Sequence, residues 1–294
     1  MTAVREDKTT DAWLAERFEE HRGRLRAVAY RMLGSLEEAD DAVQETWLRF
    51  SAAGAAQVEN LGGWLTTIVT RVCLNTLRAR AARPETFAWS HVPDPVLSPA
   101  DGPTPEQEAL LADSVGLALL VVLDTLTPAE RVAFVLHDVF DVPFGEIAPM
   151  LDRTPEAARQ LASRARHRVR AAGAREPDGA VAAQQAVVNA FFAAARAGDM
   201  SRLVELLDPE VVLRTDGFAG IPTVLRGATT VSGAALGGAS PEAEFRPVLV
   251  NGAAGMLITL RGRPAALMAF TVVGGRIAAV DGITDPHRLR RLVN

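Results

Sequence analysis

Apolar residues recur at helical spacing through most of the first 170 positions, in segments separated by small, polar or proline-containing stretches. Residues 11–33 and 35–50 predict two helices, the second with Ser35 as N-cap and Glu38 three positions on. Residues 60–80 predict a third helix, whose apolar stripe alternates with arginines. Together these three segments predict one helical bundle.

A second helical module follows a stretch that has no sustained periodicity. The helical spacing resumes at residues 106–123, and residues 126–170 predict three more helices. Thr127 is placed as an N-cap with Pro128 at the first helical position and Glu130 completing a capping box. Breaks at 141–143 and 152–154 leave a short helix, a tight turn and a longer helix, which predicts a helix-turn-helix.

The pattern changes again beyond residue 181. Residues 181–207 are helical in period with a break at Gly198-Asp199, and after residue 209 come short alternating or apolar runs separated by glycines. These runs predict an antiparallel sheet packed against the preceding helices, so the fold is expected to be multidomain, with two all-α modules and a C-terminal α+β domain.

Composition narrows the protein class. The chain has 294 residues with 48% hydrophobic content, enough for two or three domains. It has no apolar run of membrane-spanning length and no signal-peptide core at its N-terminus, so we expect a cytoplasmic protein with no membrane partner. A single Cys73 and five scattered histidines predict neither a disulfide nor a metal site, and no motif points to a cofactor.

Charge is distributed unevenly along a chain whose net charge is -5. Residues 61–83 hold four arginines and no acid, and residues 153–170 hold six arginines against the single Glu156. Between them, residues 84–113 hold six acids and no base, with six prolines at 84–105. Two basic modules on either side of an acidic, proline-rich linker suggest two nucleic-acid contacts, although solvated basic helix faces are the alternative.

Three helix faces carry the candidate chemistry. The acidic face of the second helix suits a basic partner surface, and it includes Asp41, Gln44 and Glu45. An indole, two guanidiniums and an amide on the third helix can bind phosphates and stack on unpaired bases, and these are Trp64, Arg71, Asn75 and Arg78. The outward face of the last helix of the helix-turn-helix suits a major groove, and it includes Arg159, Gln160, Ser163 and Arg164.

Three of these segments carry a family resemblance. Residues 40–50 (DDAVQETWLRF), 60–80 and 126–166 resemble regions 2.2, 2.3–2.4 and 4 of extracytoplasmic-function (ECF) sigma factors of bacterial RNA polymerase. The whole chain is similar to the sigma-J-like subgroup, which carries a C-terminal SnoaL-like domain. The resemblance implies sigma region 2 at residues 1–83, a linker at 84–105, region 4 at 106–172 and a cone-shaped SnoaL-like α+β barrel at 181–294.

The resemblance also implies roles for the three faces. Asp41, Gln44 and Glu45 are then contacts to the clamp helices of the largest subunit of core RNA polymerase. The set of Trp64, Arg71, Asn75 and Arg78 then holds the non-template strand of the minus-ten element. The set of Arg159, Gln160, Ser163 and Arg164 then reads the minus-thirty-five element of promoter DNA.

For the tail domain, the resemblance implies regulation of the sigma factor in cis. Residues 281–292 resemble the subgroup's C-terminal motif and residues 91–95 are a distant counterpart of its linker motif, which implies contact between linker and tail. A tail cavity with a small-molecule ligand is possible, and Asp216 and Asp281 are its candidate residues. Because both precede glycine, as turn residues do, and have no evident His or Tyr partner, we do not expect catalysis.

Two other functions stay open at this point. One is a ligand-responsive helix-turn-helix repressor with the tail as sensor, which would not need the acidic face at residues 40–45. The other is a tail with isomerase or hydrolase activity, since folds of this kind also occur in enzymes.

Overall fold

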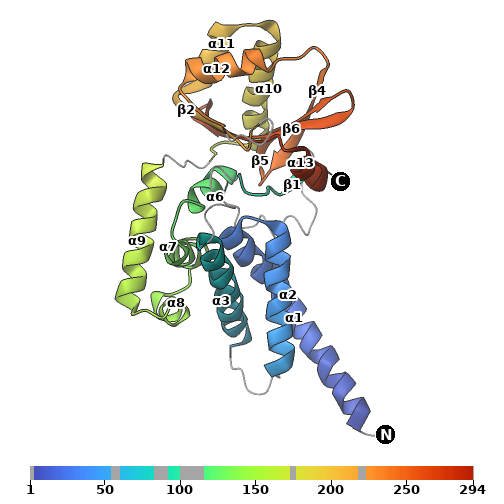
Figure 1. Cartoon of the computed structure of the whole chain (residues 1–294), viewed down its shortest axis with the longest axis vertical. Helices are drawn as coiled ribbons and strands as arrows, with labels where there is room; N and C mark the ends of the chain where they lie inside the picture. The colour runs from blue at the N-terminus through green and yellow to red at the C-terminus, as the bar shows by residue number, and fades with distance from the viewer. Residues whose placement is uncertain are drawn as a thin grey trace. The chain divides into compact units, whose positions relative to one another are not determined.

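The computed structural model describes residues 3–53, 60–82, 92–99, 116–172, 177–217 and 223–293 (Figure 1). It divides into two compact units, each described by itself below. The first unit comprises residues 1–86 and 123–171, and the second comprises residues 87–122 and 172–294. The predicted loop at 54–59, the linker at 84–91 and 100–105, and the start of the helix expected at 106 lie outside the described residues.

The first half of unit 1 is the predicted helical bundle. Its helices are α1 (Ala3–Leu33), α2 (Leu36–Ala53) and α3 (Leu61–Ala81). All three pack against one another, and their apolar stripes form a core that includes Val28, Phe50 and Val69. Gly34 ends α1 at φ 73°, a left-handed conformation that glycine adopts at low cost. The bundle predicted from the periodicity is therefore confirmed.

The second half of unit 1 is the predicted helix-turn-helix with the helix before it. Its elements are α7 (Pro128–Phe134), the π-helix η1 (Val135–Val139), α8 (Phe144–Met150) and α9 (Pro155–Ala171). The Thr127 capping box is present as predicted. The first helix of this module was expected to continue as one α-helix, but it widens into the π-turn of η1, where Phe140 donates its N–H to the Val135 carbonyl. Periodicity does not distinguish the two because both keep the same apolar side buried.

The two halves of unit 1 share a buried surface, because α3 packs against α7 and α8. Cys73 on α3 is fully buried, and burial raises the pKa of its thiol to about 12, so the thiol is neutral. Arg131 on α7 is also buried and bonds Asp124 at 2.6 Å. Cys73 is thus a small core residue.

Unit 2 is a seven-stranded sheet with helices. The sheet order is β1-β4-β5-β6-β7-β2-β3. Its strands are β1 (Leu97–Pro99), β2 (Leu207–Thr215), β3 (Thr223–Arg226), β4 (Ala243–Val250), β5 (Ala253–Leu260), β6 (Arg263–Val273) and β7 (Arg276–Ile283). Its helices are α10 (Val181–Ala197), α11 (Met200–Leu206), α12 (Ala228–Gly237) and α13 (Pro286–Val293), while α6 (Leu117–Leu123) ends at the boundary with unit 1.

The tail confirms the α+β prediction and corrects two details. Figure 1 shows α10, α11 and α12 grouped together on one side of the sheet. An aromatic cluster fills the space between these helices and the strands, with Phe192 contacting Phe191, Phe245 and Phe270. The sheet is not wholly antiparallel, because β2 pairs with β7 in parallel, and it includes β1 from the stretch expected to be linker only.

Two features are absent from the described residues. None of the helices there combines the length and apolar character that a bilayer span requires. No group of three or more His, Cys, Asp or Glu side chains in those ranges is arranged to hold a metal ion.

The packing of the tail sheet generates a stability prediction. A Cβ at Gly255 on β5 would meet the Val250 side chain and lie 3.0 Å from the Met268 carbonyl oxygen. We expect Gly255→Ala to lower the free energy of unfolding by about 1–3 kcal/mol, because strand backbones must move apart. The matched control is Gly233→Ala on α12, where nothing lies within 4 Å. Since alanine favours helix over glycine, this control should gain up to about 1 kcal/mol in chemical denaturation. Equal losses in both variants would contradict the steric explanation.

Candidate nucleic-acid interface

The acidic face of α2 lies on the outside of unit 1. Asp41 and Gln44 are exposed and Glu45 is partly exposed, whereas Val43 between them is buried. Glu45 bonds Arg49 on the same helix at 2.8 Å. Leu48 lies on the same face with 53% of its surface exposed. The structure therefore brings the three predicted residues together beside an apolar contact point.

The basic face of α3 also forms one exposed stripe. Arg71, Asn75 and Arg78 are exposed, while Trp64, one turn into the helix, is half-buried with its ring 5.8 Å from that of Phe50. Among the described residues, no carboxylate forms an ion pair with Arg71 or Arg78. These two guanidiniums can therefore bind phosphates without breaking an intramolecular bond.

Arg80, on the same helix, has a different environment. Its guanidinium donates to the Leu33 carbonyl at 2.9 Å and forms an ion pair with Glu38. It links α3 to the end of α1 and the start of α2. The arginines of α3 thus divide into one that holds the bundle and two that face solvent.

The recognition surface of α9 has the predicted orientation. Arg159, Gln160, Ser163 and Arg164 are all exposed. Ala158, Leu161, Ala162 and Ala165 are buried against the rest of the module. Arg159 also lies over the Phe144 ring of α8, with 5.4 Å between the guanidinium carbon and the ring centroid. The helix-turn-helix presents its basic side outward.

Glu130 is a buried residue that contacts this surface from beneath, and the sequence pattern did not reveal the contact. Its carboxylate lies under α9 and accepts from Arg164 Nε at 3.2 Å and Arg168 Nη1 at 2.8 Å. Burial acts to raise the pKa of Glu130, but hydrogen bonds from Thr127 and Arg164, with the charge of Arg168, hold that pKa below its ordinary value. The sequence pattern identifies Glu130 only as a capping residue, because Arg164 and Arg168 lie 34 and 38 positions further along the chain.

The two tail carboxylates are engaged in ion pairs. Asp281 on β7 is buried and bonds Arg214 on β2 at 3.0 Å. Burial raises the pKa of Asp281, and Arg214 offsets part of that rise. Asp216, at the end of β2, accepts from the backbone N–H of Thr284 at 2.6 Å and pairs with Arg288 at 3.1 Å.

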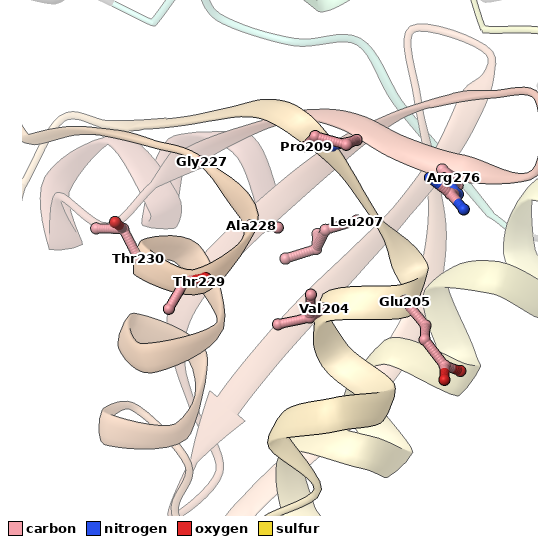
Figure 2. A pocket seen from close by; sticks show the side chains of 9 residues that line it. All are labelled: Val204, Glu205, Leu207, Pro209, Gly227, Ala228, Thr229, Thr230 and Arg276. Carbon is pink, nitrogen blue, oxygen red and sulfur yellow. The ribbon is translucent and has the colours of Figure 1, made fainter.

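One surface pocket of the tail is lined by other residues. It has a volume of about 630 Å³ and lies between α11 and α12. Figure 2 shows Glu205 and Arg276 on one side of it and Thr229 and Thr230 on the other. Neither Asp216 nor Asp281 is among its lining residues. A ligand of the tail cavity stays a prediction.

Arg288 joins the linker to the tail. Its guanidinium pairs with Asp94 at 2.7 Å and donates to the Val92 carbonyl, while its other end bonds Asp216. The side chains of Arg288, Asp94 and Asp216 are 12%, 17% and 11% exposed, so this triad is shielded from water. Linker and tail are therefore in contact, as the paired motifs implied, although His91 of the linker motif lies outside the described residues.

A strand extends the same contact. β1 pairs antiparallel with β4, with Leu97 opposite Val250. Just before it, the Val96 N–H donates to the Asn251 side chain at 2.8 Å and the Val96 carbonyl accepts from the Asn251 N–H at 2.9 Å. Residues 97–99 thus form an edge strand of the tail sheet, and Val96 adds two hydrogen bonds to Asn251 just before it. The sequence did not predict this strand, since three prolines within eight residues argue against one.

Comparison with known proteins gives consistent matches. The families described as Sigma-70 region 2 and Sigma-70, region 4 match residues 17–83 and 116–169. The ECF RNA polymerase sigma factor SigJ of Mycobacterium tuberculosis is 36% identical, over 92% of this chain and 91% of that protein. Probable ECF RNA polymerase sigma factor SigI of the same species is 33% identical, over 96% and 95%. The crystal structure of M. tuberculosis SigJ matches with a TM-score of 0.75 and 34% identity, over 94% of this chain and 98% of that one.

The Arg288 triad generates a prediction about the linker strand. We expect Arg288→Gln to speed hydrogen exchange of the amides at residues 92–99 by about tenfold or more, because it removes charge-assisted bonds shielded from water. Exchange would be followed by mass spectrometry. Arg290→Gln is the control and should leave the rate unchanged, because within the described part of the chain Arg290 contacts only the exposed His287. Unchanged protection in Arg288→Gln would show that strand pairing alone holds the segment.

Proposed function

The chain belongs to the ECF sigma factors of bacterial RNA polymerase. We propose that three faces of unit 1 each make one of the contacts that promoter-specific initiation needs. The supporting observation is that each module buries one side of a helix and exposes a charged or basic stripe on the other. A repressor that used only the helix-turn-helix would not need the faces on α2 and α3.

The α2 face is proposed as the contact with core polymerase. Its exposed carboxylates and amide, Asp41, Gln44 and Glu45, surround the exposed apolar Leu48. Such a surface fits a partner that offers basic residues around an apolar depression. The proposed partner is the pair of clamp helices on the largest polymerase subunit.

The α3 face is proposed to hold the melted minus-ten element. Arg71 and Arg78 supply cations, Asn75 between them supplies an amide, and Trp64 supplies an aromatic ring at the start of the same stripe. An aromatic ring can stack on any unpaired base, and cations bind the backbone whatever the sequence. This chemistry fits single-stranded DNA better than a protein surface.

The α9 face is proposed to read the minus-thirty-five element in the major groove. Arginine forks match guanine O6 and N7, and glutamine amides match adenine N6 and N7, so Arg159, Gln160 and Arg164 offer base-specific donors and acceptors. Ser163 completes the set as a small donor within the same turn.

The tail is proposed to regulate in cis by holding the linker. Residues 92–99 lie between the segments matched to region 2 and region 4. Fixing these residues on the tail sheet divides one long tether into two shorter ones, and a shorter tether restricts the separations that its ends can reach. No enzymatic role is proposed for the tail, since both of its candidate carboxylates are held in ion pairs with arginine.

Run-off transcription with purified core polymerase tests the promoter-binding proposal. We expect the full chain to support promoter-dependent initiation, and Arg71→Ala with Arg78→Ala to reduce open complexes by about tenfold or more, since two phosphate contacts are lost. Binding of the sigma factor to core polymerase should be unchanged in this variant. Arg226→Ala with Arg263→Ala, at two exposed positions of the tail, removes an equal charge and is the control. Full promoter opening by the double variant would contradict the role of the α3 face.

A second transcription experiment tests regulation in cis. We expect Arg288→Gln and deletion of the chain beyond residue 175 to shift output from a matched promoter in the same direction, by about threefold or more, because both release residues 92–99 from the sheet. Arg290→Gln should behave like the unmodified chain. Shifts in opposite directions would mean that the tail acts by some route other than the linker.

A further inference from the structure

We infer that Glu130 is a positioning residue for promoter reading, which fixes the guanidinium of Arg164 so that its free edge faces a base. The inference rests on the proposed role of α9. It deepens that role, because Glu130, which lies outside α9, would help to determine which promoter sequence α9 prefers. Glu130 lies at the start of α7, and two elements, η1 and α8, separate α7 from α9 along the chain.

The geometry separates a fixed part of Arg164 from a free part. Arg164 bonds Glu130 through Nε, and the Glu130 side chain is 4% exposed whereas that of Arg164 is 57% exposed. The guanidinium is planar, so a bond at Nε leaves the two Nη groups along an outward edge. A guanine presents O6 and N7 as a pair of acceptors that match the two Nη groups. Because the bond to Glu130 already orients the Arg164 side chain, binding the guanine costs less side-chain entropy.

Arg168, one turn later on α9, shares the same carboxylate. It bonds Glu130 Oε2 through Nη1 at 2.8 Å, and its side chain is 49% exposed. One buried carboxylate therefore holds two arginines of the same face. The contact neutralises part of their charge and orients the remaining donors outward, which suits directional recognition more than attraction to phosphates.

Glu130 also caps α7, and the two roles can be separated chemically. Its Oε2 accepts from the Thr127 N–H at 3.1 Å and the Thr127 hydroxyl at 2.7 Å, while Oε1 accepts from Arg164. A glutamine keeps one oxygen and can still complete a capping box. With that oxygen turned to Thr127, its NH₂ group faces the Arg164 Nε–H, so two donors oppose each other and the Arg164 bond is lost.

The module supplies a matched control. Asp138 in η1 holds Arg166 of α9 at 2.8 Å, in the same manner as Glu130 holds Arg164. Arg166 is not one of the residues assigned to base reading. Asp138→Asn therefore removes an equal charge and an equivalent α9 contact, and Thr127→Ala removes the cap while leaving the carboxylate to the arginines.

The experiment uses holoenzyme assembled from the full chain and core polymerase, on a promoter and on versions substituted at each minus-thirty-five position. The readout is the ratio of run-off transcript from the original to that from each substituted promoter. We expect Arg164→Ala and Glu130→Gln each to lower this ratio by about tenfold, and we expect the drop at the same base pair for both variants. The double variant should lose no more there than Arg164→Ala alone. Thr127→Ala and Asp138→Asn should retain the ratio.

The outcomes distinguish this inference from the function on which it rests. If Arg164→Ala keeps full discrimination at every position, the proposed role of Arg164 is wrong. If Arg164→Ala loses discrimination and Glu130→Gln keeps it, Arg164 reads DNA unaided and the inference is overturned. Equal loss at all positions by Glu130→Gln and Thr127→Ala would mean a structural role only, which also overturns it. Glu130→Asp, which keeps the charge, is the second variant and should recover part of the ratio at that base pair.

Discussion

Guanidinium groups that bridge segments far apart in the sequence hold this protein together at the places where its function is expected. Thirty of its thirty-one basic residues are arginine. A guanidinium presents several donors in a rigid plane, so one side chain can bind two acceptors in fixed directions, which an ammonium group does less well. Arg288 bonds Asp94, Val92 and Asp216 together, and Arg80 bonds Leu33 and Glu38. Replacing either by lysine would keep the charge and lose the geometry.

Arginine is also the residue type proposed to contact DNA, and Arg71 and Arg78 have no ion-pair partner among the described residues. Arg71 and Arg78 are exposed on the α3 stripe, whereas Arg80 two positions beyond Arg78 is bound within the bundle. Arg164 and Arg168 are intermediate, because each is anchored at one end and exposed at the other. Burial and partners, rather than residue type, therefore decide which arginines build the fold and which keep donors exposed for the proposed contacts with DNA.

Local patterns predicted the helices, their caps and the outward stripes, because those features depend on residues within a few positions of one another. The Thr127 capping box and the helix-turn-helix are examples. The contacts of Glu130 with α9 and of Arg288 with the linker were not predictable in this way, since the partners of Arg288 lie 72 and 194 positions away. The parallel pairing of β2 with β7 was missed for the same reason. A family resemblance pointed to the linker contact without supplying the arginine that makes it.

The two classes of contact respond differently to ionic strength, and this separates promoter binding from regulation. The stripes on α3 and α9 face solvent, so dissolved salt weakens their attraction to phosphates steeply. The Arg288 triad is mostly shielded from water, and buried pairs are screened much less. Raising the salt concentration therefore weakens the contacts with DNA while the linker stays bound to the tail sheet. Under the proposed function, the linker contact would set how the two DNA-binding modules are tethered, and the exposed arginines would set how strongly each module binds.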